Sequence, residues 1–148
     1  MFENETRTIG KAEYRISYEQ DDSPDLSYFG EYSDRPGEYA IDRAKNGGMG
    51  RNEYRYFNAA ECENMEQAQQ NYARMEAHNR GEWYMLGITV TMSILGIELE
   101  SDSLWNIESD SGSDYIEEII TTLINGCTAR AKNKAADMQK IVHILEEM

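Results

Sequence analysis

The sequence predicts an α+β fold, with a mainly antiparallel sheet of about four to five strands, a central helix, and one or two C-terminal helices packed on one face. Three observations lead to this prediction. Apolar residues alternate in short segments before residue 60 and again over 84–94, which is the period of a half-buried strand. Over 64–80, and again after residue 114, they recur every three or four positions, as on one face of a helix. Strands and helices that are grouped rather than strictly alternating favour an antiparallel sheet.

The length of 148 residues is typical of one domain, so we expect residues 1–148 to form a single domain. Residues 128–148 form a possible C-terminal helical extension. The two cysteines, Cys62 and Cys127, have neither C-x-x-C nor zinc-ligand spacing, which indicates a reducing compartment and no metal site. The N-terminus lacks the apolar core of a signal peptide, and no apolar run is long enough to span a membrane. These features predict a cytoplasmic protein without a cofactor.

The first elements are predicted to be strands. Residues 12–18 alternate between apolar and polar side chains, and so do residues 26–32. The intervening QDDSPD is a turn sequence, so we expect the two strands to form a hairpin. A third short strand, EYRYF, is expected at 53–57.

The central helix is predicted over 64–80. Asn64 and Gln67 have the spacing of a capping box, and Gly81 is the residue expected just past a helix end. The apolar face consists of Met65, Ala68, Tyr72 and Met75.

The clearest strand follows over 84–94. At Leu95-Gly96 the phase of the alternation changes by one residue, which predicts a tight turn or a bulge. After this change we expect the side chains of Glu98 and Glu100 to face solvent.

The last third is predicted to be helical. Asp114 and Glu117 have the D-x-x-E spacing of a helix start. Asn125-Gly126 is expected to form a left-handed cap, with a second helix beginning at Thr128. The apolar stripe of this last segment approaches a heptad, so a homodimer through the C-terminal helix is a further alternative.

Acidic residues dominate the charge of the chain, with 28 Asp and Glu against 14 Lys and Arg and a net charge of −14. Such a chain is repelled by nucleic acid and by anionic membranes, so we expect neither to bind directly and a basic protein surface to be the partner. Residues 98–118 contain eight acids and no Lys or Arg. Their spacing does not fit a calcium loop, and a catalytic carboxylate pair would require one acid whose pKa is raised by burial. We expect a partner-binding acidic face formed by Glu98, Glu100, Asp102, Glu108 and Asp110, with Asp21, Asp22 and Asp25 as a second patch.

The connector 43–51 is the one basic, glycine-rich segment. Its glycines would let backbone N–H groups approach a phosphate, although the P-loop pattern is absent. A flexible loop is the alternative interpretation. The candidate phosphate-binding residues are Arg43, Lys45, Gly47, Gly48, Gly50 and Arg51.

Four segments together resemble a family of small, acidic proteins of bacteriophages and prophages. They are SYFGEYSDRPGEYAIDR (27–43), GGMGRNEYRYF (47–57), YARMEAHNRGEWYMLGI (72–88) and LWNIESDSGSDYIEE (104–118). The resemblance covers roughly residues 14–123 and does not extend to the segment from Cys127 onward. It implies a phage context and a host-cytoplasm setting, and it implies no reaction, cofactor or catalytic residues.

The leading functional hypothesis is therefore a non-enzymatic phage protein. Its acidic face would mimic DNA and occupy the nucleic-acid-binding surface of a host defence protein of restriction or CRISPR type. The alternative is a module that binds a nucleotide or a phosphorylated signal at the loop 43–51. An enzyme would require a pocket that holds titratable groups with perturbed pKa values, and the sequence offers no such constellation.

Overall fold

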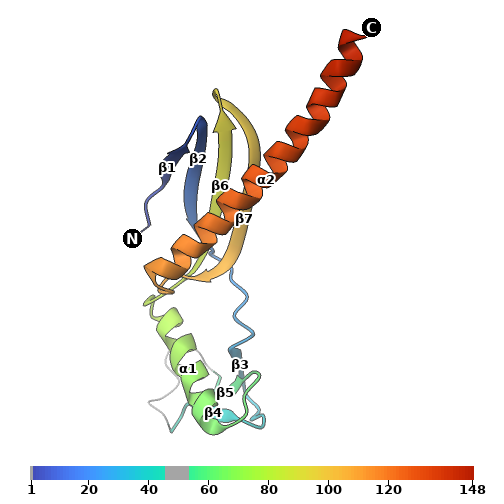
Figure 1. The fold of residues 1–148 in the computed structure, drawn as a ribbon. Coiled ribbons are helices and arrows are strands. Elements are labelled where there is room, and N and C mark those ends of the chain that lie inside the picture. The colour runs from blue at the N-terminus through green and yellow to red at the C-terminus, as the bar shows by residue number, and fades with distance from the viewer. Residues whose placement is uncertain (1, 46–53) are drawn as a thin grey trace. The chain divides into compact units, whose positions relative to one another are not determined.

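The computed structural model describes residues 2–45 and 54–148 and has the predicted α+β class (Figure 1). Within these residues there are seven strands in antiparallel sheets and two helices. In chain order the elements are β1 (Glu5–Ile9), β2 (Ala12–Gln20), β3 (Gly30–Ser33), β4 (Ala40–Asp42), β5 (Tyr56–Ala59), α1 (Met65–Asn79), β6 (Met85–Ile94), β7 (Ile97–Glu108) and α2 (Ser113–Glu146).

The chain divides into two compact units. Met1–Asp22 and Met85–Met148 form the first, which we call the sheet–helix unit, and Ser23–Tyr84 forms the second, the inserted unit. The two units differ in where their internal contacts lie, whereas a single domain is defined by cooperative folding of the whole chain. The single-domain expectation therefore stays a prediction.

The sheet–helix unit has a four-stranded sheet in the order β1-β2-β6-β7, and α2 packs on one face (Figure 1). Tyr14 pairs with Met92 and Ile16 with Val90, so their side chains share a face. The Tyr14 hydroxyl donates to Thr128 Oγ1 at 2.6 Å, which identifies this face as the one that α2 covers. The apolar side chains between the sheet and the helix form the hydrophobic core of the unit.

The predicted change of phase after residue 94 is confirmed as a turn. Leu95 and Gly96 have φ values of 53° and 75°, and the β6–β7 register shifts between Met92 and Ser93. A second shift, which the alternation does not reveal, lies at Gly87, where Asn106 on β7 has a φ of 61°. Two irregularities therefore bend β7 along its twelve residues.

The predicted helix break at Asn125-Gly126 is wrong, because α2 runs without interruption over 34 residues. Gly126 has no left-handed φ. The predicted start of a second helix, Thr128, instead donates its hydroxyl to the Ile124 carbonyl at 2.8 Å. Ile124, Cys127 and Ala131 continue the buried stripe across the glycine, and their burial outweighs the intrinsic helix cost of one glycine, about 1 kcal/mol.

Residues 132–148, which we call the extension, are exposed throughout and lie beyond the last buried residue of α2, Ala131. The C-terminal part of α2 accordingly projects past the sheet (Figure 1). The predicted extension over 128–148 is thus the last part of one continuous helix, of which residues 132–148 are exposed.

The inserted unit holds a second, three-stranded sheet in the order β3-β5-β4. The predicted hairpin between residues 12–18 and 26–32 is wrong, because β2 pairs with β1 and β6, and β3 pairs with β5. The strand β1 was not predicted. It pairs with one edge of β2, and β6 pairs with the other edge over nine residues. The core of the unit is formed by Ile41, Phe57, Ala68 and Met75.

Helix α1 has the start and end that the sequence predicts. The Asn64 side chain accepts from the Gln67 N–H at 2.9 Å, while the Gln67 side chain reaches back to the Glu63 N–H. Gly81 has a φ of 77° just past the helix. These local devices fix both ends of the helix without help from distant residues.

Candidate functional site between strand β7 and helix α2

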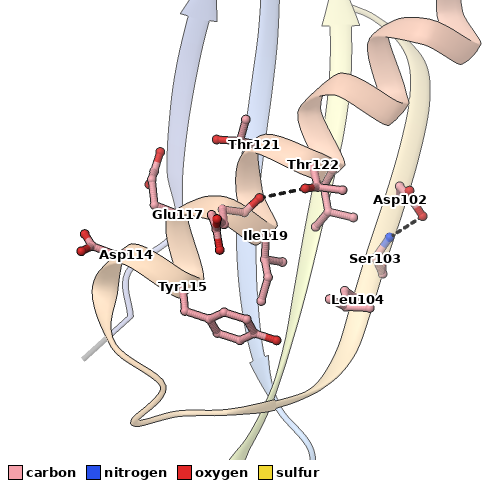
Figure 2. A pocket seen from close by; sticks show the side chains of 11 residues that line it. Asp102, Ser103, Leu104, Asp114, Tyr115, Glu117, Ile119, Thr121 and Thr122 are labelled. Carbon is pink, nitrogen blue, oxygen red and sulfur yellow. Dashed lines mark hydrogen bonds between the residues drawn. The ribbon is translucent and has the colours of Figure 1, made fainter.

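A pocket of about 810 Å³ lies between β7 and the first turns of α2, within the sheet–helix unit (Figure 2). Its volume falls in the range of ordinary ligand pockets. It is lined by Asp102, Ser103, Leu104, Asp114, Tyr115, Glu117, Glu118, Ile119, Thr121, Thr122 and Leu123.

The apolar part of the pocket comes from both elements. Leu104 pairs with Ile88 in the register of the sheet, so its side chain points to the face that carries α2. Leu104 and Tyr115 keep 44% and 50% of their surface exposed, and the Tyr115 ring points toward Leu104 in the view of the pocket (Figure 2). Ile119 and Leu123 are buried on the helix side. Two partly exposed apolar side chains over a buried floor make a surface that a partner can cover.

Four acidic residues also line the pocket, and we call them the rim: Asp102, Asp114, Glu117 and Glu118. Arg7 on β1 forms two hydrogen bonds with Glu117, at 2.5 and 2.9 Å, and these hold the pKa of Glu117 below its ordinary value. Arg130 lies 3.1 Å from Asp102. In the part of the chain that the structure describes, no ion pair involves Asp114 or Glu118. Within the described residues, two of the four rim acids are therefore paired with arginines and two are not.

The predicted acidic face does not assemble around Glu98 and Glu100. The solvent-facing prediction is wrong for Glu100, whose side chain is only 9% exposed and lies 2.6 Å from Lys134 Nζ. Lys134, with Arg130 as a second donor, holds the pKa of Glu100 below its ordinary value. Glu98 is exposed as predicted, but it pairs with Ser93 beyond the register shift, which places it on the sheet face away from α2.

Four of the other predicted acids, Glu108, Asp110, Asp21 and Asp22, lie at one end of the four-stranded sheet, because the Asp21 N–H donates to the Met85 carbonyl and Met85 pairs with Glu108. Glu108 ends β7, and the exposed Asp110 lies in the turn before α2. Asp21 and Asp22 follow β2, whereas Asp25 belongs to the inserted unit and accepts from the Ser27 N–H at 3.0 Å. Of the eight predicted partner-binding acids, Asp102 is the one that lines the pocket. Whether any of them contacts a partner stays a prediction.

The candidate phosphate site at 43–51 is described only in part. Arg43 is 3% exposed, donates to the Tyr54 carbonyl at 2.6 Å and lies 3.4 Å from Glu76. These contacts tie Arg43 into the inserted unit, while Lys45 is exposed. The remaining candidates, Gly47, Gly48, Gly50 and Arg51, lie outside the described residues.

Sequence reasoning missed the apolar half of the pocket. Tyr115 and Leu104 lie within LWNIESDSGSDYIEE, whose acids predict only a charged surface and a helix start at Asp114 and Glu117. The available signal was that an apolar strand end and an amphipathic helix start flank one short turn, Ser109–Gly112, so that both must face the same core.

The described residues include two free thiols and several carboxylates whose surroundings shift their pKa values. Among them, no group of three or more His, Cys, Asp or Glu side chains is placed to hold a metal ion. Both cysteines are free, and burial raises the pKa of the Cys127 thiol. The lowered pKa of Glu117 is the reverse of the shift that a general acid at neutral pH requires. Within the same described residues, no helix has the length and apolar character needed to cross a membrane.

No family model, no curated protein and no solved structure matched the chain. The site therefore has to be interpreted from its own geometry.

Proposed function

We propose that this protein is a non-enzymatic interaction protein that binds a basic segment of a partner protein in the β7–α2 pocket. The observation that carries the proposal is an apolar centre, Leu104 and Tyr115, in a pocket that the four rim acids also line. The sheet–helix unit has 17 acidic and 7 basic side chains, so its field attracts a basic partner before contact. An arginine or lysine side chain suits this pocket, because its stem covers apolar surface while its charge meets the rim.

The edge of the sheet supports the same proposal. Among the described residues β7 pairs with β6 alone, so it is an end strand that borders the pocket. An end strand offers backbone groups to an extended segment, and neighbouring pockets then select its side chains. The proposed ligand is an extended segment that combines basic and apolar residues.

The phage context implied by the sequence resemblance leads to the class of partner. We propose a host defence protein of restriction or CRISPR type in the host cytoplasm, bound at its basic nucleic-acid-binding surface. Carboxylates that take the place of phosphates compete with nucleic acid, and such competition weakens as salt rises. The rim acids Asp114 and Glu118, which form no ion pair among the described residues, carry this role in the proposal.

The test measures whether the protein displaces labelled DNA from a panel of purified restriction and CRISPR nucleases. We expect at least one nuclease to lose its DNA, and the double variant Asp114→Asn/Glu118→Gln to be weaker by about tenfold, since each exposed charge contributes up to about 1 kcal/mol. The matched control is Glu13→Gln/Glu19→Gln, which removes the same charge from exposed positions of β2. Displacement by no nuclease, or equal losses for the two double variants, would contradict the proposal.

A further inference from the structure

The extension presents an apolar stripe that the sheet does not cover. Met138 and Leu145 keep 56% and 61% of their surface exposed, and Ile141 and Val142 are exposed between them. Together with Ala131 and Ala135, three of these positions, Met138, Val142 and Leu145, follow a spacing of four, three, four and three residues. This is the repeat of a coiled-coil seam, which requires a second helix.

We infer that the extension pairs with the extension of a second copy of the chain, in antiparallel orientation, about a twofold axis near residue 140. In this register the numbers of facing core residues add to 280. Ala135 then faces the partner copy's Leu145, and Met138 faces the partner copy's Val142. A small residue is set against a large one in the first pair, which keeps the two helices evenly spaced along the seam.

The charges of the extension decide the orientation. Its beginning is basic, with Lys132 and Lys134, and its end is acidic, with Glu146 and Glu147. An antiparallel pair sets the basic beginning of each helix against the acidic end of the other, and it also opposes the two helix dipoles. A parallel pair in register sets like charges side by side. In the antiparallel register Lys132 and the partner copy's Glu146 flank the seam on the same side, and this contact occurs twice in the dimer.

The start of the extension offers additional apolar surface to the partner. Lys134 Nζ lies 3.5 Å from the Leu99 carbonyl, at the beginning of β7. Leu95 and Ile97, a few residues before Leu99, keep 89% and 64% of their surface exposed. The last turn of the partner helix, which carries Met148, ends beside Lys132 in this register and reaches the same end of the sheet. The inference does not depend on the proposed function, because none of these residues lines the β7–α2 pocket.

A charge exchange tests both the dimer and its orientation. Lys132 and Glu146 are 14 residues apart, roughly 21 Å along one helix, which is beyond the screening length at physiological salt. Any energetic coupling between the two positions therefore reports on contact between copies. We expect Lys132→Glu and Glu146→Lys each to raise the dimer dissociation constant at least about tenfold, because two attractive pairs become repulsive.

The measurement is sedimentation equilibrium of the full chain over a wide range of concentration, with circular dichroism to verify that each variant is folded. The chain carrying both Lys132→Glu and Glu146→Lys should regain the dimer, and an equimolar mixture of the two single variants should form a mixed dimer. Met138→Glu/Leu145→Glu, exposed positions that leave the sheet contact intact, should give a monomer. A monomer for the unaltered chain at every concentration, a higher oligomer, or failure of the charge exchange to restore the dimer would overturn the inference.

Discussion

The substitution Gly126→Ala decides between a continuous α2 and the helix break that the local sequence predicts. A Cβ at position 126 would lie 3.4 Å from an Arg130 guanidinium nitrogen and 3.7 Å from the Asp102 carboxylate, which are ordinary contacts with side chains that can adjust. Alanine then removes the helix cost of glycine, so the free energy of unfolding should rise by about 0.5–1 kcal/mol. If residue 126 were instead a left-handed cap, alanine would lower it by about 1–2 kcal/mol.

The assay is urea-induced unfolding followed by circular dichroism at one fixed protein concentration. The midpoint should move to higher urea with an unchanged slope. Gly10→Ala is the matched control, because Gly10 has a φ of 61° and open space at its Cβ. The control should be destabilised by about 1–2 kcal/mol from backbone strain alone. A loss of stability of similar size in Gly126→Ala would refute the continuous helix.

Four further predictions concern stability, and they are measured by the same unfolding assay or by hydrogen exchange. Gly87→Ala puts a Cβ within 2.3 Å of the Trp105 ring and should cost about 1–3 kcal/mol, a cost that should vanish in a Trp105→Ala background; equal costs in both backgrounds would show that the ring is not the cause. Gly30→Ala meets the Asn58 carbonyl oxygen of β5 at 2.4 Å with a φ of 145°, so it should destabilise the inserted unit by at least about 3 kcal/mol, seen as lost hydrogen-exchange protection in β3 and β5. Asn106→Gly should stay within about 0.5 kcal/mol of the parent, whereas Asn106→Val should lose about 1–2 kcal/mol at its φ of 61°. The folded-state pKa of Glu100 is depressed below 4.5, so its stabilising contribution is complete above that pH and is lost as pH falls through the folded pKa; Glu100→Gln should therefore lose less stability than the parent between about pH 5 and pH 2.

The sequence by itself determined the features that depend on neighbouring residues. Asn64 and Gln67 fix the start of α1, Gly81 marks its end, and the change of phase at Leu95-Gly96 locates the β6–β7 turn. These features can be predicted because the interacting groups are within four residues of one another, so spacing alone determines their geometry. The α+β class follows from the same local periods.

Only the tertiary structure decided which strands pair, where α2 ends and which acids are neutralised. Three features depend on how α2 and the strands pack on the sheet. They are the pairing of β2 with β6, the continuity of α2 across Gly126, and the contact of Glu100 with Lys134. A glycine that would end an isolated helix is retained when the residues on both sides of it are buried. Likewise, the segment 98–118 has one uniform charge in sequence, but a register shift turns Glu98 to the sheet face opposite Glu100, and Arg130 and Lys134 of α2 pair with Asp102 and Glu100.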